Sequence, residues 1–142
     1  MNTISALLKV KGNEILSIAP DATVYDAIHK MAEEGIGALM VMDGNKLVGV
    51  ISERDYARQI ILKGRSSENT RVREIMTTEV IVGQLSHKIE ECMGLMTVHR
   101  VRHLPILEDD KVVGVISVGD LVKAIIAEQQ STIGELERYI KG

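Results

Sequence analysis

The chain has 142 residues, 45% of them hydrophobic, with 17 basic and 20 acidic side chains and a net charge of −3 at pH 7. The net negative charge gives no electrostatic footprint of a nucleic-acid-binding surface, so we expect no nucleic-acid partner. The length suits a single shared core. The N-terminus lacks a signal-peptide core and no apolar run approaches a membrane span, which predicts a cytoplasmic protein without a membrane partner.

The first predicted element is a short N-terminal helix. Ile4, Leu7 and Leu8 fall on one helical face, and Gly12 with Asn13 would end the helix.

The next fifty residues predict the order strand, helix, strand, strand, helix. Apolar residues recur at helical spacing after Thr23 or Asp21, either of which can cap the helix. Two apolar runs then flank an Asp-Gly turn, a strong hairpin signal. The predicted elements are a strand at 15–18, a helix over 24–32, strands at 38–42 and 47–51, and a helix from Ser52.

The same order returns sixty-five residues later, where GVISERD at residues 49–55 recurs as GVISVGD at 114–120. Repetition at a fixed period defines the unit that folds, and two copies usually pack about a pseudo-twofold axis that creates paired clefts. The second copy predicts a strand at 80–82, a helix over 89–96 capped by Ser86, strands at 104–107 and 112–116, and a helix from Ser117. We therefore divide the chain into an N-terminal helix (1–13), a first repeat (14–63), a linker (64–75), a second repeat (76–128) and a C-terminal helix (129–142).

The repeated Ser-x-x-Asp motif, Ser52 to Asp55 and Ser117 to Asp120, admits two interpretations. One is a capping box, in which each side chain satisfies a free amide of the first helical turn. The other is a ligand site, because a carboxylate at a strand end can accept both hydroxyls of a ribose. The acid is Asp in both copies, where capping boxes prefer Glu or Gln, and this favours a ligand role; the serine can cap in addition.

A basic cluster at residues 99–103 precedes the second hairpin. One interpretation is a solvated C-terminal helix end, where basic side chains interact favourably with the negative end of the helix dipole. The other is a phosphate site, for which Arg102 and His103, nearest the strand, are the better candidates. The first repeat has Gly37 and Ala38 in the matching places, so the two clefts are predicted to be chemically different.

Nothing in the sequence assembles a catalyst. The single Cys92 has no placed histidine partner and is expected to be a small buried side chain, the four histidines show no metal-ligand spacing, and no Walker-type loop is present. We predict that the protein is not an enzyme and has no catalytic cofactor and no metal.

The repeated order ending in Gly-Val-Ile-Ser-x-x-Asp resembles the CBS domain, and the tandem resembles a CBS pair, or Bateman module, of the stand-alone bacterial kind over about residues 10 to 128. The resemblance implies an α/β (α+β) fold of two β-α-β-β-α repeats about a pseudo-twofold axis, with short terminal helices. It also implies adenosine-containing ligands in clefts between the repeats. One cleft would combine Ser52, Arg54 and Asp55 with Ile81, Val101, Arg102 and His103, and the other Ser117 and Asp120 with Leu16, Ile36 and Gly37.

We therefore predict a non-catalytic sensor of AMP, ADP or ATP. Two alternatives stay open: NAD or S-adenosylmethionine in the same clefts, or a ligand-free interaction module. The resemblance further implies a homodimer through the helices over 24–31 and 89–96 with parts of the second helices, and a downstream protein that the sequence does not identify.

Overall fold

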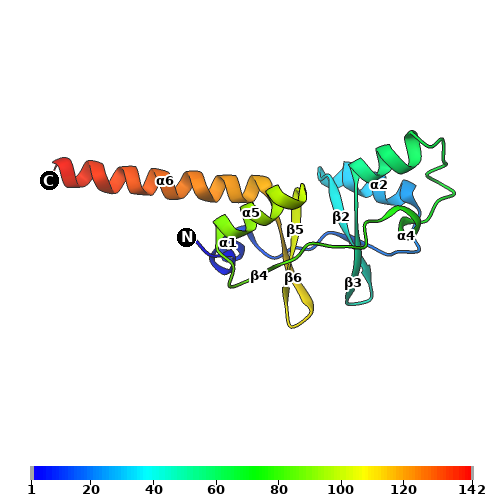
Figure 1. Cartoon of the computed structure of the whole chain (residues 1–142), viewed down its shortest axis with the longest axis horizontal. Coiled ribbons are helices and arrows are strands. Elements are labelled where there is room, and N and C mark those ends of the chain that lie inside the picture. The colour runs from blue at the N-terminus through cyan, green and yellow to red at the C-terminus, as the bar shows by residue number, and fades with distance from the viewer. Residues whose placement is uncertain (1, 142) are drawn as a thin grey trace. The chain divides into compact units, whose positions relative to one another are not determined.

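The computed structural model describes residues 2–141 (Figure 1). Two separate hydrophobic cores, and not the single shared core that the length suggests, divide the chain into two compact units. The first-repeat unit comprises residues 15–80 and 109–112, and the second-repeat unit comprises the N-terminal segment to Glu14, residues 81–108 and the chain from Val113 onward. The described residues form six α-helices and two three-stranded sheets, which confirms the predicted mixed α and β fold. No described helix is both long enough and apolar enough to cross a membrane.

The sheet of the first-repeat unit has the order β1-β2-β3, with β1 parallel to β2 and β2 antiparallel to β3. The predicted order of elements is confirmed, and the two hairpin strands begin and end within one residue of the prediction. The elements are β1 (Ser17–Ile18), α2 (Val24–Glu34), β2 (Ala38–Asp43), β3 (Lys46–Ser52), α3 (Glu53–Tyr56), a π-helical turn η1 (Ala57–Ile61) and α4 (Val72–Ile75).

Helix α2 buries the apolar face that its sequence predicts. Val24, Ala27 and Met31 are buried in the core of this unit. Of the two predicted caps the structure selects Thr23, whose Oγ1 accepts a hydrogen bond from the Asp26 N–H at 3.1 Å. The helix ends at Gly35 in the left-handed conformation, which glycine adopts without steric cost.

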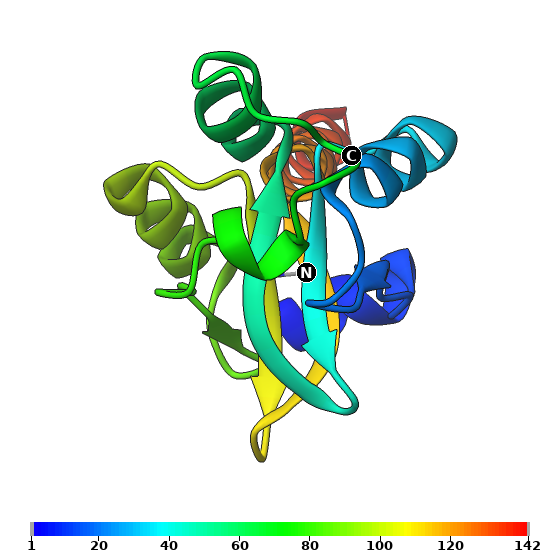
Figure 2. The same cartoon turned by 90° about the vertical axis from the view of Figure 1, so that its right-hand side faces the viewer.

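The edge of β3 is covered by residues 72–77, which span the end of the predicted linker and the start of the predicted second repeat. Val50 and Thr77 exchange two backbone hydrogen bonds of 3.0 and 2.9 Å. This close approach requires Gly49, because a Cβ there would lie 2.9 Å from the Thr77 carbonyl oxygen. Helix α4, which was not predicted within linker 64–75, packs against β3 (Figure 2) and buries Val72 and Ile75.

The second-repeat unit has the same sheet order, β4-β5-β6. The predicted N-terminal helix α1 is confirmed and belongs to this unit, because Ile4, Leu7 and Leu8 are buried in its core. Leu8 lies against Gly114, where an added Cβ would be 2.7 Å from a leucine methyl carbon. The elements are α1 (Ile4–Lys11), β4 (Gly83–Gln84), α5 (Ile89–His99), β5 (His103–Glu108), β6 (Lys111–Ser117) and α6 (Val118–Lys141).

The position predicted for the first strand of this unit, residues 80–82, is wrong, because β4 begins at Gly83. In the first-repeat unit the Met40 N–H donates to the Leu16 carbonyl at 3.1 Å. The matching donor in the second repeat would be Pro105, which has no N–H, so the ladder starts later. The pairing that remains, Gly83 with Ile106, matches Ile18 with Val41 in the first repeat.

Two further predictions in the second repeat are corrected. Ser86 does not cap α5; the cap residue is Lys88, whose N–H donates to the Glu91 carboxylate at 2.9 Å. The segment 129–142 is not a separate helix, since α6 runs unbroken from Val118 to Lys141. No proline interrupts α6, and neither of its glycines, Gly119 and Gly134, stops it.

Candidate functional site

The first Ser-x-x-Asp motif forms a complete reciprocal cap at the start of α3. The Ser52 N–H donates to Asp55 Oδ2 at 2.9 Å, and the Asp55 N–H donates to Ser52 Oγ at 3.1 Å. The Ser52 hydroxyl also donates to Oδ2 at 3.0 Å. The other oxygen, Oδ1, has the Thr77 hydroxyl at 3.4 Å, the long limit of a hydrogen bond. The capping interpretation is therefore confirmed, while a carboxylate oxygen retains further acceptor sites.

The second motif makes the same cap at the start of α6 and carries an additional cation. The Ser117 N–H donates to Asp120 Oδ2 at 2.8 Å, and the Asp120 N–H donates to Ser117 Oγ at 3.0 Å. Lys11 Nζ lies 2.6 Å from the same Oδ2 and also donates to the Val115 carbonyl. The ammonium group of Lys11, the last residue of α1, therefore pairs with the Asp120 carboxylate.

Lys11 and Thr77 hold corresponding positions against the two sheets. The Thr77 N–H bonds the carbonyl of Val50, and Lys11 Nζ bonds the carbonyl of Val115, which is the matching residue of the repeat. Each also reaches the aspartate of its own unit. The first carboxylate thus meets a neutral hydroxyl at long distance, and the second meets an ammonium group at short distance.

Burial and the charged groups around Asp120 shift the pKa values of Asp120 and His103. Partial burial raises the pKa of Asp120, but hydrogen bonds from Lys11 and Ser117 outweigh it and hold the pKa below its usual value. Burial lowers the pKa of His103, as do Lys11 and Arg102, against the opposing effect of Asp120. The imidazole is therefore mostly neutral at pH 7 and offers a hydrogen bond rather than a positive charge.

Each unit contains one matched half of the predicted site residues. Within the first-repeat unit, the Glu53 N–H donates to the Gly37 carbonyl at 3.0 Å, which places Gly37 beside the Ser52 motif. Within the second-repeat unit, the Val118 N–H donates to the Arg102 carbonyl at 3.0 Å. The first-repeat set is Leu16, Ile36, Gly37, Ser52, Arg54 and Asp55, and the second-repeat set is Ile81, Val101, Arg102, His103, Ser117 and Asp120. The facing of one set with the other stays a prediction.

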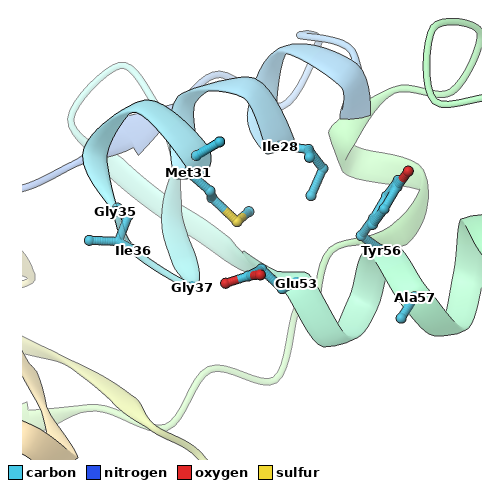
Figure 3. A pocket seen from close by; sticks show the side chains of 9 residues that line it. Ile28, Met31, Gly35, Ile36, Gly37, Glu53, Tyr56 and Ala57 are labelled. Carbon is cyan, nitrogen blue, oxygen red and sulfur yellow. The ribbon is translucent and has the colours of Figure 1, made fainter.

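A hollow of about 540 Å³ opens between α2 and the helix that follows β3 (Figure 3). Figure 3 shows Ile28 facing Tyr56 across it, and Ile36 and Gly37, both predicted ligand contacts, also line it. Its charged lining residue is Glu53, and no basic side chain lines it. The hollow therefore suits an apolar group and has nothing to neutralise a phosphate.

The remaining chemistry-bearing side chains have structural explanations. Cys92 is fully buried, and burial, followed by the nearby Glu91, raises the pKa of its thiol to about 11, so the prediction of a small buried residue is confirmed. Among residues 2–141, no group of three or more His, Cys, Asp or Glu side chains is placed to hold a metal ion.

Two α+β units with the same Ser-x-x-Asp cap define a tandem-repeat protein. The sequence profile of the CBS domain matches residues 10–62 and 72–127. The chain therefore belongs to the CBS domain family, as a tandem pair, and the resemblance seen in the motifs is confirmed.

Known relatives agree with this assignment. The chain is 40% identical to the mitochondrial CBS domain-containing protein CBSX3 of Arabidopsis thaliana, over 99% of this chain and 72% of the relative. It is 51% identical to a putative signal-transduction protein with CBS domains from Burkholderia ambifaria, whose structure superimposes with a TM-score of 0.85 over 89% of this chain and 96% of that one. The CBS domain pair of protein MJ0100, solved with 5′-methylthioadenosine and S-adenosyl-L-methionine, shares the fold at 20% identity, with a TM-score of 0.78 over 89% and 97% of the two chains.

Proposed function

We propose that this protein is a non-catalytic sensor that binds AMP, ADP or ATP through its two capped aspartates. The observation that carries the proposal is Asp55: a half-buried carboxylate fixed through Oδ2 by its own cap, with Oδ1 held only by a long contact to Thr77. Such a carboxylate is oriented before a ligand arrives, so a ribose gains two charge-assisted hydrogen bonds without first ordering the side chain.

In this proposal the other predicted residues divide the remaining work. The half-buried Leu16, Ile36, Ile81 and Val101 provide apolar contact for the adenine ring. Arg102, which is exposed, supplies positive charge for a phosphate, and the neutral His103 supplies a hydrogen bond. Gly37 replaces the basic residue in the first repeat, so the cleft formed with Asp120 is the weaker phosphate site.

A second candidate ligand is an adenosine compound without a phosphate next to the ribose. The hollow lined by Ile36 and Gly37 has an apolar wall and no cation, which would suit S-adenosylmethionine or 5′-methylthioadenosine better than ATP. The MJ0100 pair, which was solved with these two compounds, shows the same fold and is the reason for including them in the test. NAD, which carries phosphate next to its ribose, is also tested, since its adenosine half offers the same ribose.

The sensor is proposed to act as a homodimer whose interface draws on α2 and α5 with parts of the second helices. Binding would alter the relation of the repeats, because a ligand shifts an equilibrium only by its differential affinity for two states. The competing role is a ligand-free interaction module, in which the capped aspartates serve the fold alone.

Isothermal titration calorimetry with AMP, ADP, ATP, NAD, S-adenosylmethionine and 5′-methylthioadenosine tests the proposal. The expected result is heat with at least one adenine nucleotide and loss of the tighter binding event in Asp55→Ala. Thr23→Ala is the matched control, because it removes a helix cap in the same unit without touching the motif. Absence of heat with every compound up to millimolar concentration would contradict the sensor and leave the interaction module.

A further inference from the structure

The second half of α6 carries an apolar stripe that its own unit does not cover. Leu121 and Ala124 are the buried residues of α6, and the helix then continues to Lys141, past α1 and α5 of the same unit (Figure 1). Ile126, Ile133 and Leu136 are 48%, 55% and 57% exposed, and Ile140 is 81% exposed. Several large apolar side chains on one unpartnered helix mark an interaction surface.

The stripe follows the spacing of a coiled-coil seam. Its members alternate in steps of four and three residues, which keeps them on one face of a helix that pairs with another helix. Leu121 and Ala124 lie on a different face of the helix from the seam, whose apolar residues beyond Val122 are about half exposed or more. The seam consists of Val122, Ile126, Gln129, Ile133, Leu136 and Ile140.

The seam is complementary to itself when a second copy runs in the opposite direction. About a centre at residue 131, Val122 falls opposite the second copy's Ile140, Ile126 opposite its Leu136, and Gln129 opposite its Ile133. Every seam position thus meets a seam position, and the polar Gln129 lies near the middle. A single polar seam residue is a known device for fixing the register of a coiled coil.

The flanking charges favour this antiparallel register over a parallel one. Lys123 and Glu137 flank the seam on the same side, and the antiparallel register brings Lys123 of each copy to within two residues, about 3 Å along the axis, of Glu137 of the other, twice per pair. In a parallel register these two side chains are about 21 Å apart along the axis, since each residue advances the helix by about 1.5 Å. A parallel pair would also place Gln129 against Gln129.

From the seam and its charges we propose that α6 pairs antiparallel with α6 of a second copy of this chain. The interface is separate from the expected one through α2 and α5. If both interfaces form, α6 pairing joins two homodimers into a larger assembly. If only the α6 interface forms, it makes a homodimer by itself. The proposal does not depend on ligand binding.

Sedimentation velocity of the full chain from low micromolar to hundreds of micromolar concentration tests the pairing. Ile133→Asp places an unpaired charge at the centre of the seam and is expected to weaken self-association by about tenfold or more. Ser131→Asp is the matched control: it adds the same residue to the exposed face outside the seam, and it should sediment as the wild type. Equal sedimentation of Ile133→Asp and the wild type at all concentrations would overturn the proposal.

Charge reversal tests the direction of pairing. Lys123→Glu should weaken association, and adding Glu137→Lys should restore it, because each contact is then rebuilt with its charges exchanged. Failure of the double variant to recover would overturn the antiparallel register. Circular dichroism of each variant verifies that α6 remains helical, as expected for substitutions at exposed positions.

Discussion

The Asp55 and Asp120 sites have the same kind of helix cap and differ in the residue that contacts the carboxylate. In the first-repeat unit the neighbour is the Thr77 hydroxyl at 3.4 Å, and in the second-repeat unit it is the Lys11 ammonium at 2.6 Å. Lys11 comes from α1, which precedes the first repeat, whereas Thr77 comes from the segment between α4 and β4. Duplication of a sequence therefore does not duplicate a site when the covering segments differ.

This difference has a consequence for binding. A ribose can add its hydroxyls to Asp55 while the cap stays intact. At Asp120 it must compete with an ion pair whose side chains are 33% and 21% exposed, and exposed pairs of this kind contribute about 0.2–1 kcal/mol. We expect two binding events, with the tighter one at Asp55.

The largest expected effect is on ligand affinity at Asp55. Asp55→Ala removes charge-assisted hydrogen bonds to the ribose, and one hydrogen bond to a charged group is worth about 1.5–3 kcal/mol, or roughly tenfold to a hundredfold in the dissociation constant. Calorimetry should show loss of the tighter event while the weaker one remains. A variant that binds as the wild type would mean that the aspartate serves the cap alone.

The second comparison is between the two glycines that precede the motifs. An added Cβ at Gly49 meets the Thr77 backbone oxygen at 2.9 Å, whereas at Gly114 it meets the methyl carbons of Leu8, which can rotate away. Gly49→Ala should therefore lower the free energy of unfolding by about 1–3 kcal/mol. Gly114→Ala should cost less, because the Leu8 side chain can shift whereas the Thr77 backbone cannot; the unfolded-state entropy gain of about 0.4–1 kcal/mol applies to both variants.

Urea denaturation of the two glycine variants measures this difference. Equal losses of stability, or a larger loss for Gly114→Ala, would contradict the account of how the two sheets are covered.

The smallest expected effect is the pH dependence that the Asp120–Lys11 pair contributes. The pKa of Asp120 in the folded chain lies below the usual 3.8, so the stability from its contacts is present above that value and is lost as pH falls through the folded pKa. The stability difference between the wild type and Lys11→Met should be below about 1 kcal/mol at neutral pH and should shrink toward zero in acid. Thermal unfolding between neutral pH and pH 3 measures it, and a difference that grows in acid would contradict the ion pair.

Much of the fold follows from local sequence signals. Apolar runs on either side of turn residues predict the repeat and its hairpin strands. Thr23 is among the predicted caps because its hydroxyl precedes an apolar helix face. The start of β4 was misplaced because the effect of Pro105 acts across the sheet on a residue of another strand. Helix α4 is a single turn, too short to give a periodic pattern.

The candidate site was likewise predictable from the sequence only in part. The capped aspartates were predicted because cap and acid are three residues apart, whereas the Lys11 contact joins residues far apart in the chain, and no local pattern indicates it. The one signal was a basic residue immediately before Gly12, at the end of a predicted helix.

The most direct test of the unequal sites is calorimetry on the second site alone. In the Asp55→Ala background, the account predicts that Lys11→Met strengthens adenine-nucleotide binding at Asp120 by up to about fivefold, the equivalent of an ion pair worth about 1 kcal/mol. Lys9→Met is the control, since Lys9 is an exposed lysine of the same helix. Unchanged or weaker binding in Lys11→Met would contradict the claim that Lys11 competes with the ligand for Asp120.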